Sequence, residues 1–212
     1  LKGGNADDFR GAMETLRENY PHDAFYSAMN FLGTHDTPRI LTMLGADQVP
    51  QSKDERAAFR LSPQQRKKGL ALVRLATLIL FTFPGSPTVY YGDEAGMEGC
   101  EDPFNRGAYP WGHEDKDLKA RFSLLGQLRK QRQSLQSGSI QWLRASGSLL
   151  AFARELPQER TVTVVNADAL SHILTLPWTA PFAMDRLSGQ SFPVKDGILT
   201  VELPPYGGLL LT

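Results

Sequence analysis

Residues 62–92 read SPQQRKKGLALVRLATLILFTFPGSPTVYYG, and the fold class is predicted from this segment first. Ser62 fits an N-cap, Pro63 the first helical position, and Gln65 completes a capping box three residues after the cap. The segment 70–83 is almost wholly apolar and ends at a Pro-Gly pair. Because it is shorter than the roughly 20 residues of a membrane span, we expect a buried helix.

Short β-prone runs lie on either side of this helix. The run 87–91 (PTVYY) ends at Gly92, and the aromatic-rich run 24–32 (AFYSAMNFL) ends at Gly33. Both lengths favour buried strands. Strand, helix and strand in this order predict a parallel pair joined by a crossover, and a parallel sheet is stable only when both faces are covered.

Two further helices are predicted around this unit. Residues 6–19 carry apolar side chains at spacings of three and four and are followed by Pro21. Residues 117–135 carry an apolar stripe with basic residues near the C-terminal end, where cations suit the helix dipole. We expect the second helix to cover one side of the second strand.

The pattern changes to short β-prone runs from Ser137 onward. Turn clusters separate them, which is typical of an antiparallel meander or sandwich. The fold class predicted is therefore α/β followed by all-β, with domains at residues 1–137 and 138–212. The runs are IQWLR, SLLAFAR, RTVTVVN, HILTL, FAMDRL, ILTVEL and GLLLT.

Composition excludes several classes of function. The 23 basic and 23 acidic residues are spread along the chain, so no basic face for nucleic acid or anionic lipid is expected. Cys100 is the single cysteine, which excludes an internal disulfide and a multi-thiolate zinc site and favours a cytoplasmic setting over a secreted one. The chain begins at Leu1 without a recognisable leader, and we expect an upstream segment to be missing.

Ligands of parallel α/β folds bind in the loops after the C-terminal ends of the strands. Two loops qualify, at residues 33–39 and 92–111. They contain carboxylates, an amide, His and Arg side chains and aromatic rings, the groups that bind sugars. The neighbours His35 and Asp36 alone are weak evidence, because such a pair is more often a local hydrogen bond and loop charges are usually solvated.

The motifs in these loops resemble those of the α-amylase family. FLGTHDTPR (31–39) is similar to the seventh-strand motif of that family, and GSPTVYYGDE (85–94) to the eighth-strand motif, in the same order. DPFNR (102–106) and Trp111 resemble a loop of the neopullulanase, cyclomaltodextrinase and maltogenic amylase branch. The resemblance implies the last part of a (β/α)8 TIM barrel followed by a C-terminal antiparallel β-sandwich.

The resemblance also implies roles for four residues. Asp36 matches the third family carboxylate, which stabilises the oxocarbenium-like transition state and is the only catalytic residue expected here. His35 matches its partner, a donor to sugar hydroxyls. Asp102 and Arg106 match positions that contact glucose units further towards the non-reducing end, while Arg39 has no assigned role. The substrates implied are α-glucans or oligosaccharides with α-1,4 or α-1,6 linkages, or cyclodextrins.

Two carboxylates required for retaining glycosidase chemistry are missing. A nucleophile and a general acid must lie roughly 5 to 5.5 Å apart, and the family carries them on its fourth and fifth strands. Nothing before residue 24 resembles those strands, so the chain is predicted to be inactive alone and to self-associate or associate with the missing barrel part. No cofactor is implied, because any family calcium site lies largely outside these residues. The loop carboxylates Asp93, Glu94, Glu98, Glu101 and Asp102 lack an evident reason for the raised pKa that an acid needs.

Two other functions remain open on the residues alone. A non-catalytic carbohydrate-binding or interaction module would use Trp142 and Trp178 as sugar-stacking rings, although core packing is the commoner role of such residues. A small unrelated α/β enzyme would use the loop of His35 and Asp36 and would hydrolyse its substrate without any other segment.

Overall fold

The predicted parallel pair is present in the computed structural model, which describes residues 1–212. Strand β1 (Met29–Phe31) pairs with β2 (Ser86–Thr88), with Met29 opposite Ser86. The connection contains α3 (Ile40–Gly45), α4 (Lys53–Ala58) and α5 (Pro63–Thr82). The two six-residue helices were not predicted, because an element this short shows no full period of its apolar face.

Helix α5 begins as its sequence predicts. The Ser62 side chain accepts a hydrogen bond from the Gln65 amide, and the Gln65 side chain accepts one from the Ser62 amide at 3.0 Å. The helix ends at Thr82, whose successor Phe83 is extended. Its second half is buried on nearly every side, as its apolar composition requires.

The prediction of a strand over residues 24–32 is wrong in its first half. Residues His22–Ser27 form helix α2, which follows Pro21 and carries an acidic residue in its first turn. Only Phe25 of this helix is buried. A short apolar run does not distinguish a buried strand from a helix by periodicity alone, and here the Pro and Asp start signals outweigh the aromatic content.

Two other boundaries also differ from expectation. The second strand ends at Thr88 rather than Tyr91, because the chain turns there and the amide of Asp93 donates to the Tyr90 carbonyl at 3.1 Å. The helix expected over 117–135 is split at Arg132 into α6 (Lys116–Gln131) and α7 (Gln133–Ser137). Helix α6 packs against α5, with Phe122 edge-on to Phe81.

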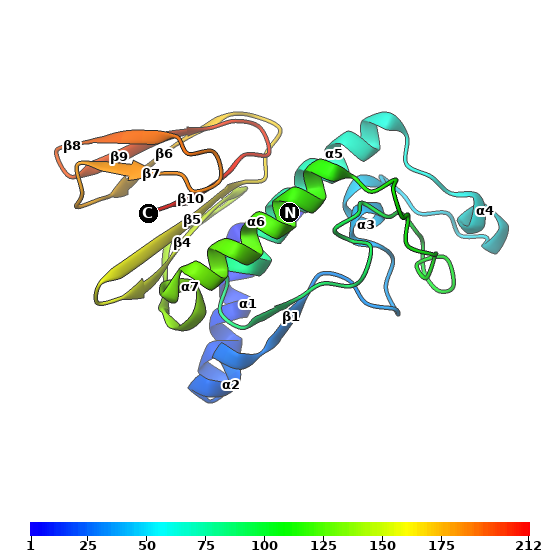
Figure 1. Ribbon diagram of the computed structural model, residues 1–212, viewed down its shortest axis with the longest axis horizontal. Coiled ribbons are helices and arrows are strands. Elements are labelled where there is room, and N and C mark those ends of the chain that lie inside the picture. Colours follow the sequence, from blue (N-terminus) through cyan, green and yellow to red (C-terminus); the bar gives the residue numbers. More distant parts are fainter.

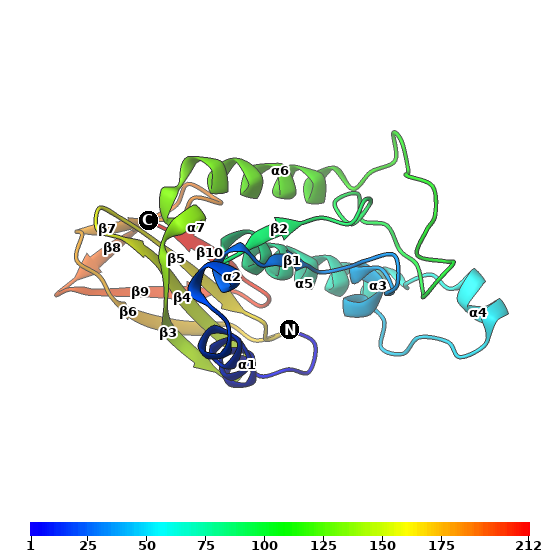
Figure 2. The same ribbon diagram turned by 90° about the horizontal axis from the view of Figure 1, so that it is seen from below.

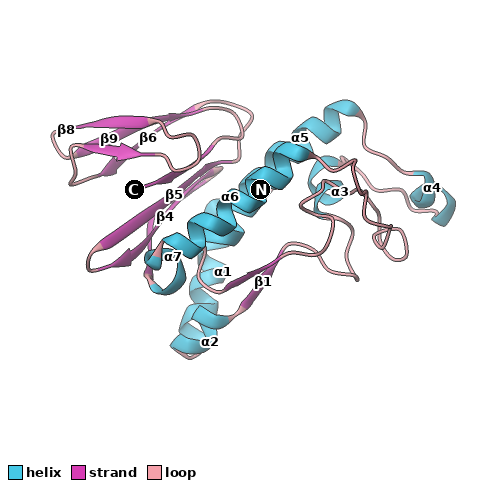
Figure 3. Ribbon diagram, in the orientation of Figure 1, coloured by secondary structure: helices cyan, strands magenta, loops and turns pink.

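The C-terminal part is antiparallel throughout, as predicted, and forms two four-stranded sheets (Figure 3). Their orders are β10-β5-β4-β3 and β6-β9-β8-β7. Strand β8 was not predicted, because Pro193 interrupts its β-prone pattern. The bounds are β3 Ser139–Ser146, β4 Leu149–Leu156, β5 Glu159–Asn166, β6 His172–Pro177, β7 Phe182–Met184, β8 Ser191–Lys195, β9 Ile198–Leu203 and β10 Gly208–Leu211.

The helices and the two sheets stack as layers with two cores between them (Figures 1 and 2). One core joins the helices to the near face of sheet β10-β5-β4-β3, through residues such as Phe152. The other lies between the two sheets and includes Ala151. The first core crosses the predicted domain boundary at Gly138, and that boundary remains a prediction.

Helix α1 (Ala6–Asn19) has the predicted bounds and packs against β3. Phe9 contacts the rings of Phe83 and Trp142, and the Trp142 indole donates to Glu14 at 2.7 Å. None of the helices combines the length and the apolar composition that crossing a membrane requires.

Candidate active site

The loop after β1 is a compact turn built by two threonines. The Thr34 hydroxyl accepts from the Asp36 amide at 3.1 Å, and the Thr37 hydroxyl accepts from the Thr34 amide at 3.0 Å. The turn directs His35 and Asp36 towards solvent, where their side chains are 62% and 72% exposed. His35 Nε2 lies 3.2 Å from Asp36 Oδ1, so the pair predicted from the motif is in contact.

The loop after β2 contributes the other two predicted residues. Arg106 Nε lies 2.6 Å from Asp102 Oδ1, and Arg106 Nη2 lies 4.0 Å from Asp36 Oδ1. The structure therefore brings His35, Asp36, Asp102 and Arg106 into one continuous chain of polar contacts. Both loops lie at the end of the molecule remote from the sandwich (Figures 1 and 2).

Asn105 ties the two loops together beneath this surface. Its buried side-chain amide donates to the carbonyls of His35 and Thr37, each at 2.8 Å. These carbonyls flank Asp36 in the sequence. Asn105 lies in the predicted polar loop but had no predicted role, because partners about 70 residues away leave no local signal in the sequence.

Arg39 and Asp93 form a second, fully buried link between the loops. Arg39 Nη1 donates to the Tyr91 carbonyl and lies 3.2 Å from Asp93 Oδ1. Its guanidinium also lies 4.3 Å from the Tyr90 ring centre and 4.5 Å from that of Tyr91. A Cβ on Gly33 would come within 2.9 Å of Asp93 Oδ2, so this carboxylate directly underlies the first loop.

Burial raises the pKa of Asp93 to about 6, against the opposing charge and hydrogen bond of Arg39. The neighbouring carboxylate of Glu94 raises it further. Asp93 is thus the loop carboxyl with the perturbed protonation that an acid needs, contrary to the expectation that none has a reason for it. It is 4% exposed and held by Arg39, so it cannot reach a substrate.

The remaining loop carboxylates are also engaged within the fold. Glu94 accepts from the Gly92 amide at 2.8 Å, Glu98 lies 2.5 Å from Arg66, and Glu101 lies 3.0 Å from Arg56. No two of them are arranged as a free nucleophile and acid. No group of three or more His, Cys, Asp or Glu side chains is arranged to hold a metal ion.

The aromatic residues divide into two sets. The rings of Tyr90 and Tyr91 lie against Arg39, which limits the faces they present to a sugar. Trp111 is 79% exposed, and its ring centre lies 4.5 Å from that of Tyr109. Trp111 is therefore the most accessible stacking surface in the loop. In the sandwich, Trp178 is buried between the sheets and Trp142 packs on Phe83, so neither ring offers an open sugar platform.

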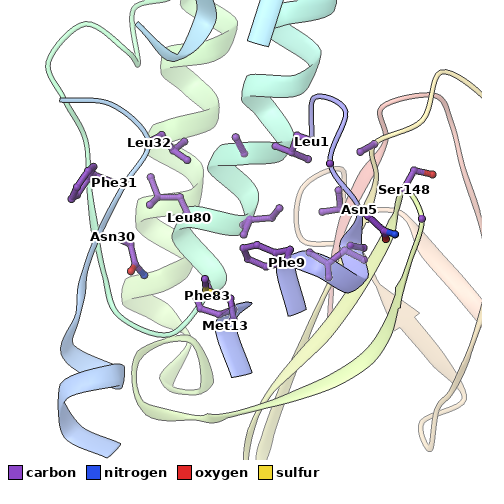
Figure 4. Close-up of a pocket in the computed structure, with 18 residues that line it drawn as sticks. Leu1, Asn5, Phe9, Met13, Asn30, Phe31, Leu32, Leu80, Phe83 and Ser148 are labelled. Atoms are coloured by element: carbon purple, nitrogen blue, oxygen red, sulfur yellow. The ribbon is translucent and has the colours of Figure 1, made fainter. Parts of the chain in front are cut away.

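A cavity of about 290 Å³ lies elsewhere, between α1, α5, β1 and the β3–β4 turn (Figure 4). Phe9, Met13, Leu80 and Phe83 contribute to its wall. None of its 18 lining residues has an ionisable side chain. It provides no acid, base or charged anchor and is not a catalytic site.

Two family models match the chain. The model of the α-amylase catalytic domain matches residues 2–147, and that of the maltogenic amylase C-terminal domain matches residues 140–210. An amylopullulanase of Thermoanaerobacter thermohydrosulfuricus is 34% identical over 93% of this chain and 14% of its own length. A cyclomaltodextrinase of Geobacillus thermopakistaniensis is 31% identical over 97% of this chain and 32% of its own length. The chain thus spans less than a third of each of these two relatives.

Solved structures agree with the sequence matches. A cyclomaltodextrinase structure superposes with a TM-score of 0.81 at 25% identity, over 99% of this chain and 34% of that one. A structure from Thermus thermophilus superposes with a TM-score of 0.77 at 30% identity, over 98% and 40%. With the first family model covering more than half of its residues, the chain belongs to the α-amylase family.

Proposed function

We propose that residues 1–212 form the last part of the catalytic barrel and the following sandwich of a retaining glycoside hydrolase or transglycosidase acting on α-glucans. The substrate class is α-1,4- or α-1,6-linked glucans or cyclodextrins. The observation that carries the proposal is the contact of His35, Asp36 and Arg106 across two loops that follow neighbouring parallel strands.

Each residue of the cluster has a proposed task. Asp36 stabilises the positive charge that develops on the sugar ring in the transition state, and His35 donates a hydrogen bond to a sugar hydroxyl. Arg106 and Asp102 form a donor and acceptor pair for a glucose unit further along the chain, with Trp111 available for stacking. Charges this exposed act weakly in bulk water, so the task requires that substrate and a further wall exclude solvent.

The nucleophile and the general acid come from another segment. The loop carboxylates of this chain are held in ion pairs or in backbone hydrogen bonds, which supports the proposal. Residues 1–212 alone are therefore proposed to be inactive. Their proposed task is to supply the substrate-binding groups and Asp36 to a site whose nucleophile and general acid lie in another segment.

The proposed partner is the segment that supplies the other barrel strands. β1 is hydrogen-bonded to β2 on one edge and to no strand on the other, and it exposes Met29 (63%) and Phe31 (49%). An open apolar strand edge is a surface for strand addition. Self-association of isolated residues 1–212 through this edge is the alternative outcome, and sedimentation at two concentrations distinguishes it.

The proposal is tested by measuring hydrolysis of maltooligosaccharides and cyclodextrin by residues 1–212 and by a form extended upstream. Activity in the extended form alone, lost in Asp36→Asn, supports it. Activity of residues 1–212 alone contradicts it. Glucan binding by residues 138–212 would instead favour a carbohydrate-binding module.

A further inference from the structure

Asn105 occupies an unusual place between the two loops of the proposed site. Its side chain is buried, and its single amide nitrogen donates to His35 O and Thr37 O at 2.8 Å, with Thr34 O at 3.5 Å. Three carbonyls of one turn thus converge on one donor group from another loop. The next residue in the sequence is Arg106, which reaches Asp36.

We propose that Asn105 is a positioning residue that fixes Asp36 relative to Arg106. This inference rests on the proposed function, because it concerns the geometry of that same site. The amide holds the backbone on both sides of Asp36, so the turn that carries the carboxylate moves only together with the loop of Asp102 and Arg106.

Local bonds alone do not fix this geometry. The turn has its own hydrogen bonds from Thr34 and Thr37, but these act only within residues 34–37. The links of Arg39 to Asp93 and to the Gly99 carbonyl hold the loop at its end, three residues beyond Asp36, and do not bond to the turn itself. The ion pair of Arg106 with Asp36 is long, at 4.0 Å, and both side chains are exposed. An exposed ion pair of this kind contributes little to holding two loops. The buried neutral amide is the stronger link.

Asn105 differs from a purely structural asparagine because the carbonyls that accept its hydrogen bonds, those of His35 and Thr37, lie on either side of Asp36. Asn166 in the sandwich donates in the same way: its buried amide nitrogen donates to Leu170 O at 2.8 Å, Pro204 O at 2.9 Å and Leu203 O at 3.5 Å. Its Oδ1 also accepts from the Asp168 amide at 2.9 Å, whereas Asn105 Oδ1 is buried without a partner. It lies on β5, in the sandwich and outside the two loops of the proposed site. Asn166→Ala is therefore a control of matched burial and matched donor bonds that loses one further hydrogen bond, which makes it the stricter test of stability alone.

The kinetic test compares Asn105→Ala and Asn166→Ala in the upstream-extended enzyme with a maltooligosaccharide as substrate. Displacing reacting groups by about 1 Å costs on the order of 100-fold in rate. We expect Asn105→Ala to lower kcat/KM by that order, with KM raised as well as kcat lowered. A loss of folded enzyme alone lowers the apparent kcat and leaves KM unchanged, and Asn166→Ala is expected to show only this.

A second measurement does not depend on activity. Hydrogen exchange of residues 33–39 in the 212-residue chain is expected to accelerate in Asn105→Ala and to remain unchanged in Asn166→Ala. Equal exchange and unchanged kinetic constants in an active Asn105→Ala enzyme would overturn the inference. An inactive wild-type enzyme with accelerated exchange in Asn105→Ala would instead overturn the proposed function and leave the link between the loops established.

Discussion

Asp93 shows how burial and an ion pair compete at a single residue. Its carboxylate contacts the Arg39 guanidinium at 3.2 Å, yet its pKa is raised from 3.8 to about 6 because removal from water outweighs that attraction. Glu94 is the other charged group that acts on it. The ionised form of Asp93 therefore lowers the stability of the folded state, and other interactions of the fold must offset this loss.

The raised pKa predicts the sign of a pH effect on stability. Between pH 4 and 6 the folded state keeps a proton on Asp93 that the unfolded state has released, so this carboxyl lowers the free energy of unfolding as pH rises. The loss is complete above pH 6 and amounts to about 3 kcal/mol for a shift from 3.8 to about 6. Asp93→Asn removes this pH-dependent contribution to the free energy of unfolding, although it also removes the carboxylate that pairs with Arg39.

The measurement is denaturant unfolding of wild type and Asp93→Asn at pH 4 and pH 7. We expect the stability of the wild type relative to the variant to fall by up to about 3 kcal/mol between these two pH values. Two proteins whose stabilities change in parallel would contradict the raised pKa. Comparing differences between two pH values removes the pH-independent cost of the unpaired Arg39.

Residues with local motifs were predictable, and residues that act across loops were not. His35, Asp36, Asp102 and Arg106 were assigned from two short motifs, and the structure places the four side chains in one chain of contacts, while their roles in binding and catalysis stay predictions. Asn105 and the partners of Arg39 were missed because each binds a loop more than 50 residues away. No periodicity or cap marks such a contact in a single sequence.

Among the helices and strands, those with strong local signals were predicted correctly, and the short ones were missed or assigned to the wrong type. The capping box located α5 and the period of apolar residues gave α1, because both signals are set within one or two turns. The run 24–32 failed because an apolar aromatic segment of this length suits either a helix or a strand. Phe25 is buried in this segment through contacts with distant residues such as Phe83, and a single sequence does not show those contacts.

Helices α3 and α5 meet at two glycines, and this contact holds the base of the first loop. A Cβ on Gly69 would lie 2.9 Å from the Gly45 Cα and 2.9 Å from Leu41 Cδ1. Helix α3 begins directly after Arg39, so a shift of α3 is transmitted to that buried side chain. Gly69 is needed here because α3 and α5 approach each other closely, and its backbone is not left-handed.

Gly69→Ala is expected to destabilise the protein despite the better helix propensity of alanine. Propensity contributes about 1 kcal/mol in favour of alanine, but overpacking against a backbone atom costs about 1 to 3 kcal/mol. We expect a net loss on the order of 1 kcal/mol in denaturant unfolding. Gly11→Ala in α1 is the control, since nothing lies within 4 Å of its Cβ, and it should gain up to about 1 kcal/mol. A gain at both positions would contradict the close contact.

In the whole molecule, strands β4 and β5 of sheet β10-β5-β4-β3 are buried on both faces, while the edge strand β3 is partly exposed. Strand β4 presents Phe152 to the helical core and Ala151 and Ala153 to the second sheet. A sheet shared by two cores couples the barrel part to the sandwich, because residues of the same strand line both cores. The apolar run at residues 149–153 of β4 has its physical reason here, since a strand covered on both faces needs no polar alternation.

Arg154 is the polar exception on this strand and joins three elements. Its side chain is fully buried, donates to Gly138 O at 3.0 and 2.8 Å, and donates to Thr82 O at the end of α5 at 2.9 Å. Burial lowers its pKa to about 10, with the nearby Arg129 adding to the effect. No carboxylate pairs with it, so the carbonyl groups of Thr82 and Gly138, together with the Tyr26 ring at 5.9 Å, compensate the buried charge.

Arg154→Met is therefore expected to weaken the junction between barrel part and sandwich. The change fills a similar volume but leaves the buried Thr82 and Gly138 carbonyls without a donor, at about 1 to 3 kcal/mol each. We expect a loss of about 2 to 4 kcal/mol in thermal or denaturant unfolding. Arg160→Met on the adjacent strand β5 is the control, because Arg160 forms a partly exposed ion pair with Glu155 and such a pair contributes about 1 kcal/mol or less. Equal stabilities of the two variants would show that Arg154 is not what fastens α5 to the shared sheet, and the coupling would then rest on apolar contacts such as Phe83 with Phe152.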